Sequence, residues 1–166
     1  MTREEFKICY TILESSDQLP KDEKILVDEA RKMCEKAYAP YSAFFVGAAV
    51  QLENGNIIRG SNQENGAYPS GLCAERVAVF AASSMFPGLE MKKIAVSAKT
   101  KNMEVSDPVS PCGACRQVLL EYETLQKKPM KIILSKEDGR VIVIEKARDL
   151  LPLSFTGESL KKPKKA

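Results

Sequence analysis

The feature that most constrains this chain is a pair of cysteines in the stretch PCGACRQV, residues 111–118. Cys112 and Cys115 are three positions apart at a predicted helix start, so their side chains lie on one face of the helix. The helix dipole favours thiolates at this end, and tetrahedral zinc accepts thiolate ligands with this spacing. Taken alone, the pattern also fits a redox pair, half of a structural zinc site or a chance occurrence.

A third cysteine, Cys73, also stands at a predicted helix start. A structural zinc site is usually closed by four protein ligands. The fourth would have to be Cys9, in a predicted strand, or Cys34, in the middle of a predicted helix, and we interpret both as small buried apolar side chains. Three protein ligands leave one position open for water, which is typical of catalytic zinc.

The chain contains no histidine. This absence excludes Ser-His-Asp and Cys-His catalysis, so an acid–base group must be a carboxylate, Lys, Tyr or Cys. Glu75 follows Cys73 on the first helical turn, which would place its carboxylate beside the predicted metal-bound water. We predict that Glu75 transfers protons and that the neighbouring Arg76 offsets the negative charge of three thiolates. Without the cysteines, both residues would be interpreted as surface charges.

Length and charge indicate a single domain. A chain of 166 residues suits one hydrophobic core. The basic tail 161–166 carries four lysines of a chain whose net charge is +3, so the remainder is nearly neutral and lacks a basic stripe for nucleic acid. No apolar run has the length of a membrane span, and the first residues are not typical of a secretory signal. We expect a cytoplasmic protein that binds neither nucleic acid nor membrane, with a disordered tail.

The hydrophobic pattern predicts a meander followed by alternating helices and strands. Asn54-Gly55 predicts a type I′ hairpin turn. This order is typical of one mixed sheet with helices on both faces, a three-layer α/β/α sandwich of about five strands. We assign one domain to residues 1–160, with 1–20 as an extension that forms a possible edge strand. The predicted strands are 4–13, 45–52, 56–61, 93–99, 130–135 and 140–145, and the predicted helices are 21–38, 72–84, 112–124 and 146–151.

The motif Cys73-Ala74-Glu75 followed by Pro111-Cys112-Gly113-Ala114-Cys115 resembles the C-x-E…P-C-x-x-C signature of zinc-dependent nucleoside and nucleobase deaminases. The resemblance extends over roughly residues 24 to 160 and is closest to the small, homotetrameric, three-cysteine cytidine deaminases. It implies one zinc ion per subunit. The stretches that carry it are AYAPYSAFFVGAAV, GSNQENGAYPSGLCAERVAVF, VSPCGACRQVLLEY and LLPLSF.

The resemblance implies further site residues that spacing alone does not show. In the family, Asn and Glu of an N-x-E-N loop bind the ribose, and these are Asn62 and Glu64 here. Phe44 resembles the aromatic residue that packs on the pyrimidine, and the backbone of Ala74 resembles the amide that meets its 2-oxo group. A neighbouring subunit, related by D2 symmetry, would contribute three residues to each site. These residues match Gly66, Tyr68 and Phe155.

Two departures from the family pattern are visible. Gly66 stands where alanine is frequent, which makes the loop more flexible. The extension 1–20 and the long connection around Lys101-Asp107 are additions with no assigned role.

The resemblance implies hydrolytic deamination of cytidine and deoxycytidine to uridine and deoxyuridine, with release of ammonia, as in pyrimidine salvage. Three alternatives remain open. They are a deaminase of another small cytosine-containing substrate such as blasticidin S, a polynucleotide cytidine deaminase, and a zinc-stapled module without catalytic activity. The last would require a fourth protein ligand, and the second a basic groove with interleaved aromatic residues.

Overall fold

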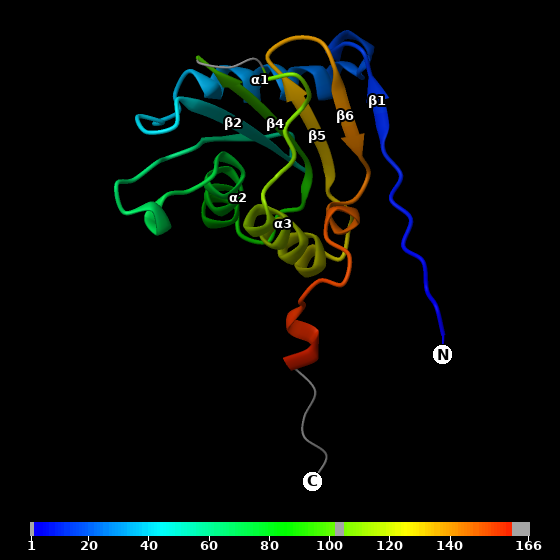
Figure 1. The fold of residues 1–166 in the computed structure, drawn as a ribbon. Helices are drawn as coiled ribbons and strands as arrows, with labels where there is room; N and C mark the ends of the chain where they lie inside the picture. Colours follow the sequence, from blue (N-terminus) through cyan, green and yellow to red (C-terminus); the bar gives the residue numbers. More distant parts are fainter. Residues whose placement is uncertain (1, 102–104, 161–166) are drawn as a thin grey trace.

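A mixed sheet of six strands forms the centre of the computed structural model (Figure 1), which describes residues 2–101 and 105–160. The predictions for the tail 161–166 and for part of the 101–107 connection fall outside the described residues. The spatial order is β1-β6-β5-β4-β2-β3. The strands are β1 (Thr11–Leu13), β2 (Phe44–Leu52), β3 (Ile57–Ser61), β4 (Met91–Thr100), β5 (Lys131–Lys136) and β6 (Val141–Ile144).

The sheet is mixed because β4 and β5 run parallel, whereas every other neighbouring pair is antiparallel. A parallel pair needs a long crossover, and α3 (Gly113–Gln126) supplies it. The predicted three-layer architecture is confirmed. The sheet has six strands rather than about five, because the N-terminal extension adds the short edge strand β1, paired antiparallel with β6.

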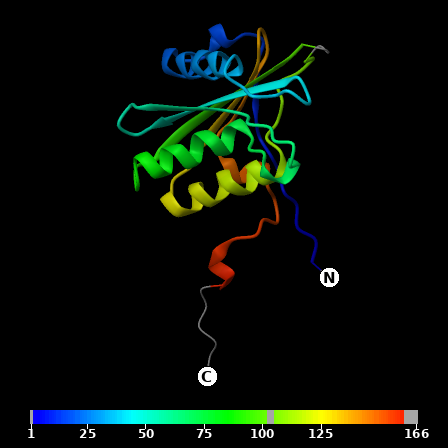
Figure 2. The same cartoon turned by 90° about the vertical axis from the view of Figure 1, so that its left-hand side faces the viewer.

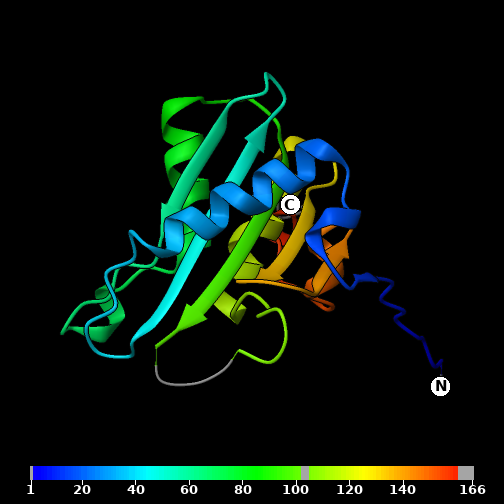
Figure 3. The same cartoon turned by 90° about the horizontal axis from the view of Figure 1, so that it is seen from above.

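Helices cover both faces of the sheet. Figure 2 shows α1 (Lys21–Cys34) on one side and α2 (Ala74–Met85) with α3 on the other, and Figure 3 shows α1 lying across the strands. The helix predicted over 21–38 ends earlier than expected. The reason is that Tyr38 leaves the helix to pair with the loop after β3, donating its amide to the Asn62 carbonyl at 3.0 Å.

Two apolar cores follow from the alternation of side chains along the central strands. On β2, Ala48 and Val50 pack toward α2 and α3, whereas Ala49 packs toward α1. The same alternation holds on β4 and β5, where the residues on the α2–α3 side are Ile94, Val96, Ile132 and Leu134. Within the described residues, no helix is long and apolar enough to cross a membrane.

Two glycines allow the helices to lie directly on the sheet. A Cβ atom at Gly47 would lie 2.0 Å from the Ala30 carbonyl oxygen on α1. A Cβ atom at Gly60 would lie 2.5 Å from the Ala78 nitrogen and 2.6 Å from the Ala74 carbonyl oxygen on α2. Backbone atoms cannot move aside as a flexible side chain can, so Gly60 sets how closely the start of α2 approaches β3.

Two local predictions are wrong. The strand predicted over 4–13 is formed only at Thr11–Leu13. Thr11 pairs with Val143 and β6 ends at Ile144, so β6 offers at most one further partner to the residues before Thr11. The hairpin between β2 and β3 is not a type I′ turn, which requires a positive φ at both central residues. Gly55 has a φ of 85°, whereas Asn54 does not lie in the left-handed region. The Leu52 amide bonds to the Asn56 carbonyl, so the loop has three residues, with glycine at the left-handed position.

We expect Gly60→Ala to lower the free energy of unfolding by about 1–3 kcal/mol, because overpacking against backbone atoms forces α2 away from β3. Chemical denaturation would measure this change. Gly157→Ala is the matched control, since a Cβ atom at Gly157 meets no atom within 4 Å. Equal stability of the two variants would show that α2 tolerates the displacement.

Candidate active site

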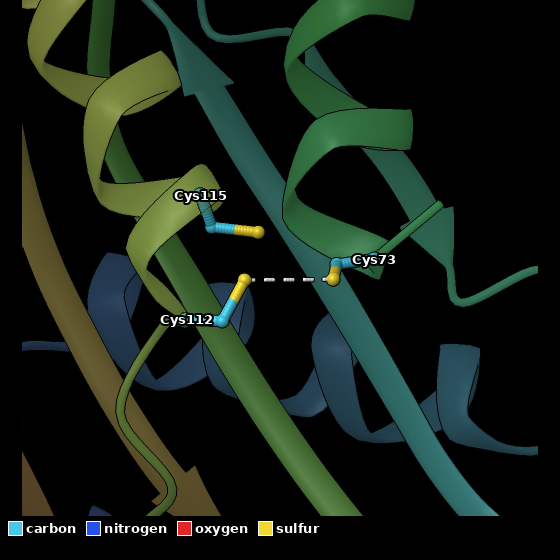
Figure 4. A group of neighbouring side chains, drawn as sticks. All are labelled: Cys73, Cys112 and Cys115. Atoms are coloured by element: carbon cyan, nitrogen blue, oxygen red, sulfur yellow. Dashed lines mark hydrogen bonds between the residues drawn. The ribbon is translucent and has the colours of Figure 1, made fainter. Parts of the chain in front are cut away.

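The three predicted cysteine ligands meet where two helices begin (Figure 4). Cys73 is the N-cap residue of α2, Cys112 is the N-cap residue of α3, and Cys115 lies on the first turn of α3. Both N-caps have extended backbone conformations, with ψ angles of 153° and 167°. The Sγ atoms of Cys73 and Cys112 are 3.8 Å apart, and all three sulfurs lie within 4.8 Å of one another.

These distances suit a tetrahedral metal centre. Zinc–sulfur bonds of about 2.3 Å place tetrahedral sulfur ligands roughly 3.8 Å apart. The donor set, three sulfurs at two helix N-termini, is one that zinc accepts. Neither remaining cysteine belongs to the cluster. Cys34 is buried on α1, as expected, and its thiol donates to the Ser97 carbonyl at 3.3 Å. The interpretation of Cys9 as a buried side chain is wrong, because Cys9 is exposed near the N-terminus, ahead of β1. Among the described residues, the cluster therefore has three protein donors and no fourth.

The thiols of Cys73 and Cys115 shift each other's pKa in opposite directions. The pKa of Cys73 is lowered to about 5, chiefly by a hydrogen bond from the Cys115 thiol, with further contributions from Arg76 and Cys112. The same hydrogen bond, together with burial, raises the pKa of Cys115. A metal that bound all three sulfurs would displace this proton, because metal ligation requires thiolates.

Glu75 lies beside the cluster in a desolvated position. Its side chain is 5% exposed, and burial raises the pKa of the carboxyl above its ordinary value. A hydrogen bond with Cys115 acts in the opposite direction. A raised pKa moves a carboxyl closer to neutral pH, where a single group that accepts and donates a proton is most effective.

Arg76 contacts the cluster from the first turn of α2, three residues after Cys73. Its Nη2 atom donates to the Cys73 sulfur at 3.7 Å and to the Gly71 carbonyl at 3.5 Å. The hydrogen bond to Cys73 raises the pKa of the guanidinium. The structure therefore places a permanent positive charge against the Cys73 sulfur, whose pKa is lowered.

A cavity of about 660 Å³ opens onto these residues. Its wall contains Cys73, Cys112, Glu75 and Arg76, as well as the predicted substrate contacts Phe44, Asn62 and Glu64. Ala74 is fully buried at the start of α2, where the first backbone amides of a helix have no intrahelical partner. The sequence did not single out several other lining residues, which include Tyr41, Ser42, Val46, Leu72, Val96, Val109 and Ser110.

Asn62 holds the start of β2 in place. Its Oδ1 atom accepts the Val46 amide at 2.7 Å, and its Nδ2 atom donates to the Phe44 carbonyl at 2.9 Å. The Oδ1 atom can accept one more hydrogen bond, and the Nδ2 atom can donate one more. These bonds set the position of Phe44 in the cavity wall.

Glu64 is held from one side by the turn that precedes β2. Its Oε2 atom accepts the Tyr41 amide at 2.9 Å and the Ser42 amide at 3.3 Å, and the Ser42 hydroxyl donates to Oε1. The bond from Ser42 lowers the pKa of Glu64, so the carboxylate is charged at neutral pH. An ionised carboxylate only accepts hydrogen bonds, so it favours a hydroxyl donor in the cavity and repels an anion. The sequence shows Ser42 in the PYS stretch but gives no sign that it bonds to Glu64. Only the fold reveals this contact.

The three residues expected to serve a neighbouring subunit are exposed, but Tyr68 also lines the cavity of its own chain. Tyr68 is 76% exposed and packs edge-on against Tyr41, with 6.1 Å between ring centroids. Gly66 lies under the same ring, since a Cβ atom there would come within 3.1 Å of the Tyr41 hydroxyl. Phe155 is 64% exposed and does not line the cavity of its own chain, although its carbonyl accepts a hydrogen bond from Gln117.

Comparisons with known proteins agree with this geometry. The family model for the cytidine and deoxycytidylate deaminase zinc-binding region matches residues 20–128. The chain is 42% identical over 139 residues to a cytidine deaminase from Halalkalibacterium halodurans, a match that covers 84% of this chain and 98% of the relative. A cytidine deaminase from Sporosarcina psychrophila is 43% identical over 140 residues, covering 84% and 95% of the two chains.

Solved structures lead to the same group. The crystal structure of a Burkholderia pseudomallei cytidine deaminase has a TM-score of 0.69 at 43% identity, covering 79% of this chain and 97% of that one. A Mycobacterium tuberculosis cytidine deaminase has a TM-score of 0.63 at 31% identity, covering 82% and 99%. The fold and the cysteine cluster thus define a deaminase with a zinc-binding region. The chain belongs to the cytidine and deoxycytidylate deaminase family.

We expect Cys73→Ser and Cys115→Ser each to reduce bound zinc from one ion per chain to near zero, because removing one of three thiolates leaves too few ligands for stable coordination. Cys9→Ser and Cys34→Ser are controls that should keep the metal. Atomic absorption on purified protein would measure the stoichiometry. Loss of zinc in either control would reveal a fourth protein ligand and a closed structural site.

Proposed function

We propose that this protein is a zinc-dependent cytidine deaminase. It hydrolyses cytidine and deoxycytidine to uridine and deoxyuridine with release of ammonia, which is a pyrimidine salvage reaction. The observation that carries the proposal is the position of Glu75. A buried carboxyl with a raised pKa adjoins a three-sulfur cluster at the wall of a cavity of about 660 Å³.

Cys73, Cys112 and Cys115 would hold one zinc ion per chain. Bound zinc lowers the pKa of a water molecule and so supplies hydroxide at neutral pH. Glu75 would take a proton from the attacking water and pass it to N3 of the pyrimidine as the bond between oxygen and C4 forms. It would then take the proton of the new C4 hydroxyl and pass it to the amino group, which leaves as ammonia when the C4–N bond breaks. Arg76 offsets the charge of the thiolates through its contact with Cys73.

The cavity wall supplies the remaining substrate contacts. Phe44 packs against the pyrimidine, and the Ala74 amide at the start of α2 meets the 2-oxo group. Asn62 and Glu64 bind ribose hydroxyls. They do so through the hydrogen-bonding positions that their existing bonds to β2 and Ser42 do not use. The charged Glu64 supports this role, since a carboxylate pairs with a hydroxyl and repels a phosphate.

The active site is completed in a homotetramer with D2 symmetry, and the protein works in the cytoplasm. Gly66, Tyr68 and Phe155 reach the cavity of a neighbouring subunit. Two observations support this arrangement. Tyr68 and Phe155 are large and exposed, at 76% and 64%, and Phe155 lies away from its own cavity. An exposed aromatic residue gains most by burial against another subunit.

The substrate is a free nucleoside rather than a polynucleotide. The chain outside the basic tail is nearly neutral, so a phosphate backbone has little to bind. Blasticidin S and other small cytosine compounds are compared directly with cytidine in the assay below. Faster turnover of such a compound than of cytidine would reassign the substrate while keeping the chemistry.

Ultraviolet absorbance should show that the zinc-loaded protein converts cytidine to uridine. This conversion should stop when a chelator is added. Glu75→Gln should keep the zinc and the fold while turnover falls by about 10²–10⁴-fold, because the amide cannot carry the proton. Metal content and circular dichroism control for folding. Chelator-insensitive turnover, or wild-type turnover by Glu75→Gln, would contradict the mechanism.

A mixing experiment tests the shared site. Glu75→Gln and Phe155→Ala should each have low activity alone. Unfolded and refolded together, they should regain activity, because the Glu75→Gln subunit supplies an intact Phe155 to the neighbouring site that has an intact Glu75. Each variant refolded alone is the control. No gain on mixing would place Phe155 within the site of its own chain or outside any site.

A further inference from the structure

The chain that follows β6 returns to α3 and lies beside it (Figure 1). It forms the short 3₁₀ helix η3 (Ala147–Leu150), a turn over residues 151–153 and an irregular stretch that contains Phe155. Residues 147–156 are named the C-terminal segment. Phe155 is the residue that the proposed function assigns to the cavity of a neighbouring subunit, so the contacts that fix this segment also fix that ring.

Glu123 of α3 anchors the start of the C-terminal segment. Its side chain is fully buried, and the proposed mechanism does not use it. Its Oε2 atom accepts the Ala147 amide at 2.6 Å and the Met130 amide at 2.9 Å, and its Oε1 atom accepts a hydrogen bond from Nε of Arg148 at 2.7 Å. Breaking these bonds would leave a buried carboxylate unpaired, which is costly in free energy. The start of the segment is therefore held firmly to α3.

Arg116 ties the middle of the segment to the metal-binding end of α3. Its Nη1 atom donates to the Leu150 carbonyl at 3.1 Å, and its Nε atom donates to the Pro111 carbonyl at 2.8 Å. Pro111 comes directly before Cys112, the N-cap residue of α3. Arg116 and Glu123 are seven positions apart, which is about two helical turns, so both lie on the face of α3 that the segment covers.

The turn after Leu150 is strained. Leu153 has a φ of 53°, in the left-handed region that costs free energy for any residue with a side chain. Its side chain is fully exposed, so burial does not offset this cost. Such a conformation persists only where contacts on both sides hold it. Arg116 supplies the contact before the turn, and Gln117 supplies the one after it, since its Nε2 atom donates to the Phe155 carbonyl at 3.0 Å.

The residues on either side of Phe155 face α3, whereas Phe155 does not. Ser154 and Thr156 line a shallow groove together with Leu120 and Thr124 of α3. Phe155 lies between them in sequence, does not line this groove and is 64% exposed. The segment is thus attached to α3 by its flanking side chains and by the backbone carbonyl of Phe155, which leaves the ring available to another subunit.

We propose that Gln117 is a positioning residue for the active site of the neighbouring subunit. Its hydrogen bond to the Phe155 carbonyl holds the exit of the Leu153 turn and so aims the ring into the neighbour's cavity. Gln117 does not line the cavity of its own chain, so it acts on catalysis only through Phe155. The proposal rests on the shared active site of the proposed function.

Gln117→Met tests the contact, because methionine has nearly the same shape but no donor. Its kcat/KM for cytidine should fall by about three- to tenfold, as expected for the loss of one neutral hydrogen bond, while the zinc content stays at one ion per chain. Glu121→Met is the matched control and should keep wild-type turnover. Glu121 is exposed on the same helix, and its side chain makes no hydrogen bond or ion pair with another described residue.

A second background separates positioning from a general structural role. In a Phe155→Ala chain, Gln117→Met should cause no further loss of turnover, because the ring that Gln117 positions is already absent. Wild-type turnover by the single variant, or the same fold-loss in both backgrounds, would overturn the proposal.

Refolding with a large excess of Glu75→Gln chains shows which subunit Gln117 serves. Nearly every active Gln117→Met chain then has neighbours with an intact Gln117 and Phe155. Its turnover per active chain should rise to that of wild-type chains diluted in the same way. A value that stays three- to tenfold lower would mean that Gln117 acts within its own chain and would overturn the proposal.

Phe155→Ala, diluted in the same excess, tests the shared site itself. If Phe155→Ala is restored and Gln117→Met is not, only the role of Gln117 is wrong. If Phe155→Ala is not restored, the shared active site is wrong and the role of Gln117 is overturned with it. Chelator-sensitive turnover of the wild-type protein reports separately on the catalytic function.

Discussion

The structure depends on the convergence of two helix N-termini at one place. α2 and α3 lie on the same face of the sheet, and their first residues bring Cys73 within 3.8 Å of Cys112. Each N-terminus carries a partial positive charge that stabilises thiolates. The contact between α2 and β3 at Gly60 holds this geometry, since no side chain separates the two backbones there. The three-sulfur cluster, the position of Glu75 and the shape of the cavity all follow from it.

Charge around the cluster is balanced within one helical turn. Three thiolates on a divalent ion leave a net negative charge, which weakens the ion as an electrophile. Arg76 meets Cys73 at 3.7 Å and counters part of that charge. Glu75, one residue earlier, is turned inward and buried instead. Adjacent residues on a helix point about 100° apart, so one turn can supply both a buried carboxyl and a partly exposed cation.

The cavity wall depends on polar contacts between segments that are distant in sequence. Asn62 fixes the start of β2, and the turn at Tyr41 and Ser42 fixes the Glu64 carboxylate. The prediction that Asn62 and Glu64 belong to the site rested on a family resemblance. The structure adds that both are already part of the hydrogen-bonded frame, so each has a limited number of positions left for a ligand.

Several features could be predicted from the sequence because they depend on local chemistry. The spacing of Cys112 and Cys115, the helix starts and the alternation on the central strands are determined by neighbouring residues. The tertiary structure decided the rest. It ended α1 at Cys34 because Tyr38 bonds to the Asn62 loop. It kept β1 short because β6 ends at Ile144, one residue beyond the partner of Thr11. It also brought Cys73 to the other two cysteines and enclosed Glu75, because a pKa raised by burial depends on atoms from the whole fold.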